Sequence, residues 1–458
     1  MPNFIAYLAI YCWPLISVWL YLRYSALTAT FWTIFGAYMF LPEKTAVDLP
    51  LVPGLNKENI AIYSAIFGCF VIKKIRFRLP RKAVGAKILI CIGMLIPAFT
   101  VLTNLDPVFT GATVKPGLSP QDILSMTLQL SFMLAPFILG ALLIKDSNDG
   151  LNVLKLIAVA GLIYSPLMII EVLVSPQLHT WIYGFFPHRF DQQFRFGGYR
   201  PAVFMGHGLL VANFSVVVLI AITGLWKAKK KIFLGPNWLY VIYGLFLLII
   251  CKSVGPWILG ILGLLILTIF SPRVSLLTAF AIASTVVLYP LLAMLDFIPH
   301  QSLLDAAAVF GPDKVGSLGF RFSNEELMLA HGRERILFGW GGWARNRIDG
   351  VIPDGYWIIT FTQFGLFGYL VFFGLPLLAV KKMREKIRAV KNKDEQYIVA
   401  TFGIMIAMLM VDQIPNASQQ NWVIFIYGAA IGFFAQRRSS SPLPEKTSQR
   451  QYLSTSLP

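Results

Sequence analysis

Charge is scarce in this sequence, and acidic residues are the scarcest charged class. Asp and Glu account for only 22 of the 458 residues, 13% of the residues are charged, and 57% are hydrophobic. A water-soluble fold with this composition would leave too much apolar surface in contact with water. Because lipid offers no hydrogen-bond partner to an unpaired backbone group, the composition predicts an all-α polytopic integral membrane protein.

Cysteine and histidine are also sparse, with four cysteines and five histidines. No two cysteines have the CxxC spacing of a zinc site, and we interpret all four as packing residues. The sequence also lacks the glycine-rich loop ahead of a lysine with which P-loop proteins bind nucleotide phosphates. We therefore expect no metal and no cofactor, so any reaction must draw its free energy from the substrate.

Long hydrophobic runs, by contrast, are abundant, and a run of about 17 to 25 apolar residues can cross a bilayer as a helix. Thirteen windows approach this length: 4–22, 26–41, 58–72, 86–103, 122–144, 152–174, 202–225, 237–251, 254–270, 275–295, 356–380, 397–411 and 422–436. They predict a membrane domain over residues 1–436 with about thirteen transmembrane helices, within a range of 12–14. Lys252, Gly255 and Pro256 interrupt the stretch 237–270 and predict a tight hairpin between two short helices.

Lysine and arginine gather in four short segments, at 73–82, 227–231, 381–393 and 437–438. Counting the predicted helices places all four segments on one side, which the positive-inside rule identifies as the cytoplasm. The N-terminus is then outside, and residues 437–458 form a disordered cytoplasmic tail. The net charge of +17 is explained by topology and by contact with anionic membrane lipids, so we expect no nucleic-acid partner.

Two outward loops remain, at 175–200 and 297–355. The first carries Arg189, Arg195 and Arg200 to the mouth of a helix whose first turns hold His207. Outward loops are normally poor in arginine, so these residues point to an anionic ligand such as a phosphate. The alternative is that they pair with Asp191 or with lipid phosphates.

The second outward loop has three features of its own. Ser323 and Glu326 form a capping-box pattern that predicts a helix over 323–337, with Arg321 at its N-terminus as part of an anion site. The alternative is an ordinary capped surface helix. Trp340 and Trp343 offer flat faces either to sugar rings or to the membrane interface.

Asp354 lies at the outer end of the eleventh predicted helix, at the depth expected for a general base that faces an outward cavity. The alternative is a solvated surface carboxylate.

The stretch from Arg321 to Gly368 resembles the signature region of the bacterial O-antigen ligase and polysaccharide polymerase superfamily. The matching motifs are Arg321, ILFGWGG at 336–342 and DGYWIITFTQFGLFG at 354–368. In the last motif Tyr356 or Trp357 takes the aromatic position, Gln363 the acidic position, and Gly365 and Gly368 the two glycine positions.

The first outward loop is similar to the comparable loop of the superfamily through Arg195, Gly197, Gly198 and Arg200. The sequence SVG at 253–255 stands where many members have a Ser-Arg pair, with Lys252 as the nearest cation. The chain departs from the superfamily at its His-Asn pair, which Asp354 and Gly355 replace. The imidazole that ligases use to activate the acceptor is therefore missing unless His331 or His207 substitutes for it.

The resemblance implies a glycosyltransferase of GT-C-like architecture that works without a metal on the periplasmic face of the bacterial inner membrane. The donor would be a glycan on undecaprenyl diphosphate, and the acceptor a lipid-A core sugar, a second lipid-linked glycan or a protein hydroxyl. Other polysaccharide assembly proteins are possible partners.

The site residues implied by the resemblance fall into two groups. The catalytic group is Arg195, Arg200, His207, Arg321 and Asp354, and the substrate-binding group is Lys252, His331, Trp340, Trp343 and Tyr356. Two other functions remain open: a transporter or flippase of lipid-linked oligosaccharide, and a non-catalytic subunit of a polysaccharide export complex.

Overall fold

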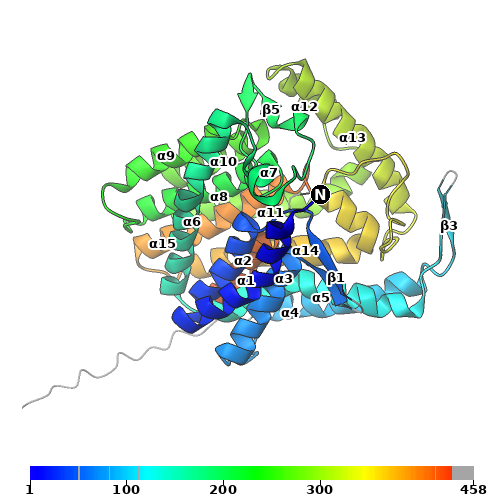
Figure 1. Ribbon diagram of the computed structural model, residues 1–458, viewed down its shortest axis with the longest axis horizontal. Coiled ribbons are helices and arrows are strands. Elements are labelled where there is room, and N and C mark those ends of the chain that lie inside the picture. Colours follow the sequence, from blue (N-terminus) through cyan, green and yellow to red (C-terminus); the bar gives the residue numbers. More distant parts are fainter. Residues whose placement is uncertain (50–51, 82, 111–112, 418, 436–458) are drawn as a thin grey trace, which may run out of the picture.

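The protein is described by a computed structural model, which shows a helical bundle with three small two-stranded hairpins (Figure 1). The described residues are 1–49, 52–81, 83–110, 113–417 and 419–435. The predicted tail at 437–458 lies outside them.

Each of the thirteen hydrophobic windows overlaps a helix, although the helix predicted from residue 202 begins only at Gly208. The corresponding helices are α1 (Phe4–Arg23), α2 (Ala26–Phe40), α3 (Lys57–Phe67) continued by the π-helix η1 (Gly68–Ile72), α4 (Val84–Leu102), α5 (Pro120–Leu143), α6 (Ser147–Val174), α8 (Gly208–Lys227), α9 (Asn237–Ile250), α10 (Val254–Ile269), α11 (Pro272–Met294), α14 (Tyr356–Ile387), α15 (Lys393–Asp412) and α16 (Asn421–Ala435). Within the described residues, 8 of these helices are long and apolar enough to cross a membrane. Helices α2, α9, α10 and α16 are apolar but shorter. The protein is thus a mostly helical chain of membrane character, and the number of spans stays a prediction.

The remaining elements lie in the connections. They are β1 (Ala46–Leu49), β2 (Val52–Asn56), β3 (Val108–Thr110), β4 (Thr113–Lys115), α7 (Leu178–Tyr183), the 3-10 helix η2 (Asp191–Gln193), β5 (Phe194–Arg195), β6 (Gly198–Tyr199), α12 (His300–Ala308) and α13 (Pro312–Arg333). The β3–β4 hairpin projects at one edge of the molecule, beyond α5, while β5, α12 and α13 lie together at the top of the view (Figure 1).

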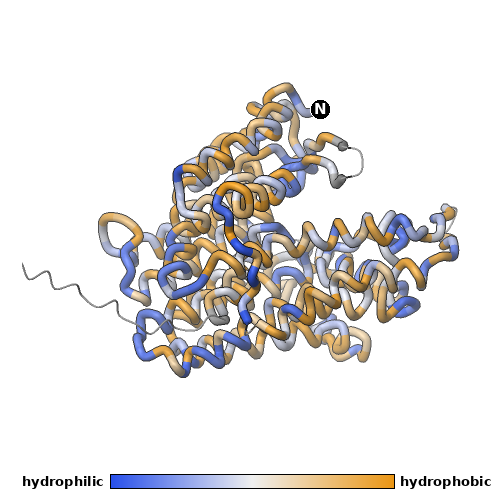
Figure 2. Tube along the Cα trace, turned by 90° about the horizontal axis from the view of Figure 1, so that it is seen from below, coloured by the Kyte–Doolittle hydropathy of each residue, from blue (hydrophilic) through white to orange (hydrophobic). Residues whose placement is uncertain are grey.

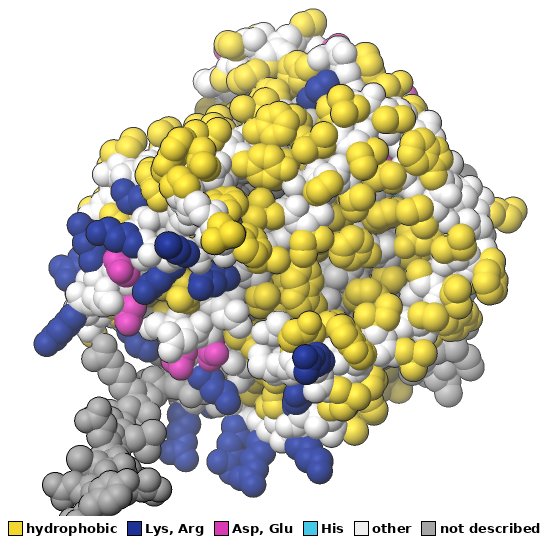
Figure 3. All heavy atoms as spheres, turned by 60° about the vertical axis from the view of Figure 1, so that its left-hand side comes forward, with side chains coloured by type: hydrophobic (Ala, Val, Ile, Leu, Met, Phe, Trp, Pro, Cys, Tyr) yellow, Lys and Arg dark blue, Asp and Glu magenta, His cyan; other side chains and the backbone are white. Residues whose placement is uncertain are grey.

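Burial separates the central helices from the peripheral ones. In the most apolar stretch of α8, 89% of the residues are buried. The share is 72% in α15 and 28% in α1. A helix that is hydrophobic all round and still half exposed requires an apolar solvent. Hydropathy along the chain and the largely apolar surface of one face agree with lipid contact, and lysines and arginines gather along the lower edge of that face (Figures 2 and 3).

Helix α14 is broken at Gly365, whose φ of 67° lies in the left-handed region. The turn at 336–341 fills the break. The amides of Trp340 and Gly341 donate to the carbonyls of Thr362 and Gln363 at 2.8 and 2.9 Å. The amide of Leu366 donates back to the carbonyl of residue 336 at 2.8 Å. Two motifs that are separate in the sequence therefore form one backbone unit.

The helix predicted over 323–337 is wrong in its boundaries. Helix α13 begins at Pro312, directly after Gly311 with φ 101°, and ends at Arg333. The Ser323 hydroxyl donates to the carbonyl of Gly319 at 3.1 Å, as serines inside helices do, and does not cap a helix. Arg321 consequently lies within the helix, so the anion site expected at a helix N-terminus there does not exist.

The hairpin predicted within 237–270 is confirmed. Helix α9 ends at Ile250 and α10 begins at Val254, and Lys252 between them has a positive φ of 47°. Gly255 and Pro256 belong to the first turn of α10, where proline is tolerated because its missing amide has no helical partner.

Candidate functional site

The guanidinium of Arg200 contacts three side chains at the end of the loop 175–200. Its Nε donates to Oε1 of Gln193 at 3.2 Å and its Nη1 donates to Oγ of Ser253 at 3.3 Å. Its Nη2 lies 3.1 Å from Nε2 of His207, the residue that caps α8. These contacts join β6, the start of α10 and the start of α8 around one cation.

This group is buried among other cations. Arg200 is only 6% exposed, and burial lowers its pKa to about 10, with further lowering by the charges of Arg195 and Arg321. Burial and the charge of Arg200 lower the pKa of His207 to about 3, so this imidazole is neutral at physiological pH. Burial is the larger cause of both pKa shifts, and the positive charges of the neighbouring arginines add to it.

Two lysines complete the arrangement. The pKa of Lys314, on α13, is lowered by burial and then by Arg195 and Arg200, and its Nζ lies 5.0 Å from the ring centroid of Phe196. Nζ of Lys252 lies so close to Gly198 that a Cβ at this glycine would overlap it. We use the name cationic cluster for Arg195, Arg200, Lys252, Lys314 and Arg321.

One carboxylate reaches the cationic cluster from the start of α14. Nε of Arg321 donates to Oδ2 of Asp354 at 3.0 Å, and the two side chains are 31% and 37% exposed. This ion pair joins α13 to the residue that the sequence marked as a candidate base. Both side chains are partly exposed, so a ligand can reach them.

No family model matches this chain, and no curated protein matches it either.

Six of the ten sequence-predicted residues thus belong to the cationic cluster or contact it directly. They are Arg195, Arg200, His207, Lys252, Arg321 and Asp354. They come from the segment 195–207, from the connection between α9 and α10, and from the segment 321–354. A cluster with this excess of positive charge is stabilised by an anion, and guanidinium groups suit phosphate oxygens in particular.

His331 and Trp340 are placed elsewhere, in a stacked pair under the turn that fills the break in α14. Their rings are parallel within 5° with centroids 4.4 Å apart. Nε1 of Trp340 donates to the carbonyl of His331 at 2.8 Å, and Nε2 of His331 lies 3.0 Å from the carbonyl of Arg345. Both side chains have partners within the fold.

The last two predicted residues differ in exposure. Trp343 is 56% exposed with a positive φ of 53°, so its ring is free to contact a ligand or the membrane interface. Tyr356 is 8% exposed and packs against Phe372 and Phe373, with centroids 6.1 and 6.0 Å away. Its ring therefore supports α14 across the break.

Lys314 and Gln193 were not among the predicted residues. Lys314 carried a usable signal, because it is a cation in a loop that is predicted to face outward, where cations are normally scarce. Gln193 carried no such signal. It is a neutral residue whose Oε1 accepts hydrogen bonds from Arg200 at 3.2 Å and from the Gly208 amide at 3.1 Å.

Proposed function

We propose that the protein is a membrane glycosyltransferase that transfers or polymerises glycan from undecaprenyl diphosphate carriers, like the O-antigen ligases and polymerases that its motifs resemble. The observation that carries this proposal is the buried Arg200 within the cationic cluster, next to the ion pair of Arg321 and Asp354. A diphosphate leaving group carries negative charge, which would offset the positive charge of this cluster.

The reaction that this arrangement supports is a displacement at the anomeric carbon of the donor sugar. The acceptor hydroxyl oxygen forms a bond to that carbon, and the bond from the carbon to the diphosphate oxygen breaks with its electron pair on the leaving oxygen. Arg200 and Arg321 stabilise the negative charge that grows there, which is the usual role of preorganised donors. Asp354 accepts the proton of the acceptor hydroxyl.

The acceptor and the membrane arrangement follow from the same proposal. The acceptor would be a lipid-A core sugar or a second lipid-linked glycan, with the exposed ring of Trp343 available for stacking on it. The chain would cross the bacterial inner membrane about thirteen times in a GT-C-like arrangement. Its basic segments would lie in the cytoplasm and the cationic cluster at the periplasmic face.

A transporter of lipid-linked oligosaccharide is the second candidate, because α14 is a discontinuous helix and many transporters bind their substrates at such breaks. In those proteins the freed backbone groups coordinate the substrate. Here the turn at 336–341 takes up the backbone groups of Thr362, Gln363 and Leu366. The break therefore joins two parts of the fold, which favours the transferase.

The test is a transfer assay with the purified protein in proteoliposomes, supplied with the undecaprenyl-diphosphate-linked repeat unit of its host and resolved by product size. A ladder of longer lipid-linked chains identifies a polymerase, and a single transfer to lipid-A core identifies a ligase. Movement of intact donor across the bilayer without a new glycosidic bond identifies the transporter. Absence of both activities in folded protein would support a non-catalytic subunit.

A further inference from the structure

The six residues that connect Arg200 to His207 are held by side chains from elsewhere in the bundle. The amides of Ala202 and Val203 donate to Oε2 of Glu171 at 2.8 and 2.7 Å. The amide of Phe204 donates to the hydroxyl of Tyr164 at 3.1 Å. Both holding residues belong to α6, so α6 fixes the first half of the connection.

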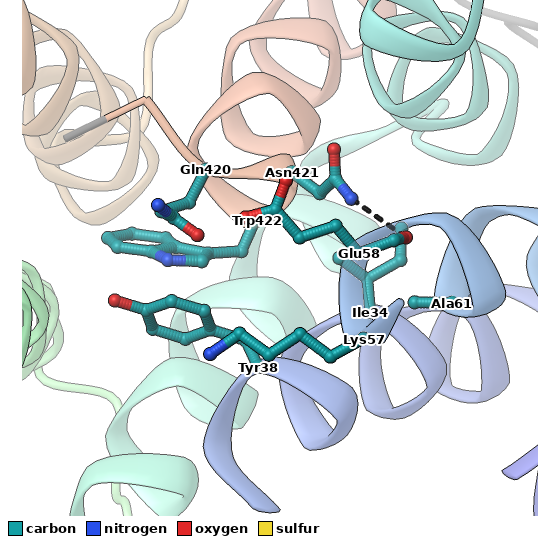
Figure 4. A pocket seen from close by; sticks show the side chains of 8 residues that line it. All are labelled: Ile34, Tyr38, Lys57, Glu58, Ala61, Gln420, Asn421 and Trp422. Atoms are coloured by element: carbon teal, nitrogen blue, oxygen red, sulfur yellow. Dashed lines mark hydrogen bonds between the residues drawn. The ribbon is translucent and has the colours of Figure 1, made fainter. Parts of the chain in front are cut away.

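The second half is held from α3. Nζ of Lys57 donates to the carbonyl of Phe204 at 3.4 Å and forms an ion pair with Oε2 of Glu43. Lys57 is only 3% exposed, and its Nζ lies 5.1 Å from the ring centroid of Tyr38. Figure 4 shows the Lys57 side chain running alongside Tyr38, beneath the indole of Trp422.

The side chain of Glu43 packs against Gly206. A Cβ added to Gly206 would lie 2.7 Å from Cγ of Glu43, and the φ of Gly206 is 81°. The backbone of Glu43 is itself fixed, because its amide donates to Nε2 of His179 at 3.2 Å. Nδ1 of that ring lies 2.7 Å from the carbonyl of Phe185. The Glu43 carboxylate is thus placed against the residue that precedes His207.

We infer that Lys57 and Glu43 are positioning residues that set the Arg200–His207 pair for anion binding; the role of the pair rests on the proposed function. Neither residue touches the cationic cluster, and both act through the backbone at 204–206. Lys57 is the buried partner of this ion pair, whereas the Glu43 side chain is 30% exposed. Loss of Lys57 removes both the donor to the Phe204 carbonyl and the charge that holds the Glu43 carboxylate against Gly206. It therefore releases the connection and, with it, the geometry of the Arg200 guanidinium.

Backbone hydrogen exchange tests the positioning without reference to any activity. In purified protein, Lys57→Met should speed exchange in the peptide covering 202–208 about tenfold, since the freed segment opens more readily. Lys227→Met is the matched control, because Lys227 also donates to a carbonyl, that of Thr268 at 3.1 Å, and lies 5.4 Å from the Tyr397 ring centroid. It should leave that peptide unchanged.

Glu43→Gln serves if Lys57→Met does not fold. It keeps a side chain against Gly206 and removes only the charge, so exchange at 202–208 should still rise, although less. Unchanged exchange at 202–208 in both folded variants would overturn the inference. So would a uniform rise across all peptides, which would reveal a general structural role.

A double-mutant cycle of binding then tests whether the effect of Lys57 on anion binding passes through Arg200. The probe is inorganic diphosphate, titrated calorimetrically into wild type, Lys57→Met, Arg200→Ala and the double variant. Lys57→Met should weaken binding about tenfold in the presence of Arg200 and have no further effect in its absence, as expected for coupled residues. Equal losses in both backgrounds would contradict the inference. If wild type binds no diphosphate, the proposed function loses its anion site, and hydrogen exchange alone decides the positioning.

Discussion

Arg200 makes contacts that only a guanidinium can make. Three of its nitrogens face three different partners, Gln193, Ser253 and His207. A lysine keeps the charge but has a single nitrogen, so it cannot hold all three. We expect Arg200→Lys to slow glycan transfer at least about tenfold, as loss of a preorganised donor does.

Arg189→Lys is the matched control for that measurement. Arg189 lies in the same loop, but its side chain is 73% exposed and pairs with Asp191 at 2.8 Å. An exposed ion pair of this kind contributes little. Equal transfer rates in the Arg200→Lys and Arg189→Lys variants, assayed at equal protein levels, would argue against a role for Arg200 in the reaction.

The buried imidazole of His207 makes stability depend on pH. Burial and Arg200 hold its pKa at about 3, against 6.5 in an unfolded chain. Between these values the unfolded state binds more protons, so the free energy of unfolding falls as the pH decreases from 6.5. Replacement by glutamine removes this proton uptake and should flatten the loss of stability on acidification.

That prediction is checked by the melting temperature in detergent, followed by tryptophan fluorescence from about pH 7 to about pH 5. His207→Gln should lose fewer degrees over this range than wild type. His300→Gln, at an exposed position on α12, serves as the control. A slope for His207→Gln identical to that of wild type would show that His207 does not set the acid sensitivity.

At the scale of elements, the hydrophobic windows located the helices well because a membrane helix needs a long apolar run wherever it lies. The start of α13 was missed because Ser323 satisfies a capping pattern while it actually bonds back to Gly319 within a longer helix. The run before it, from Pro312, is too polar to show a hydrophobic period. Local patterns therefore placed apolar helices better than polar ones.

The candidate site also contains some residues that the sequence could predict and others that it could not. Arg195 and Arg200 were predictable because arginine in a loop that is predicted to face outward contradicts the expected charge distribution. Arg321 was predicted from the family motif and from a helix start that lies elsewhere in the structure. The stacking of His331 on Trp340 could not be predicted, because it depends on a turn that inserts into a break in α14. The sequence contains both halves of that unit, but nothing local shows that they meet.

Gly365 is the residue on which that unit depends. Its φ is 67°, and a Cβ there would overlap the backbone carbonyl of Leu337. Gly365→Ala should therefore lower the free energy of unfolding by about 2 kcal/mol or more, the range of other strained backbone sites. Gly342→Ala should cost little, because nothing lies within 4 Å of a Cβ at Gly342. Equal thermal stability of the two variants would contradict the close approach.

For the whole molecule, the proposed topology puts the basic segments and the cationic cluster on opposite sides of the membrane. We expect a cysteine at Ser302, in α12, to react with a membrane-impermeant maleimide in intact spheroplasts, and a cysteine at Lys391 to react only after lysis. Both positions are exposed in the structure. The background is a variant without the four native cysteines. Labelling of Lys391→Cys in intact spheroplasts would show that the orientation is the opposite of the proposed one.

In the proposed reaction the protein breaks the bond between a glycan and its lipid diphosphate. The most direct measurement is the amount of undecaprenyl diphosphate released in proteoliposomes for each glycosidic bond formed. We expect equal amounts of the two products in wild type and in Arg189→Lys, a requirement for acceptor, and loss of both products in Arg321→Ala. Transport of intact donor without release of undecaprenyl diphosphate would contradict the proposed reaction.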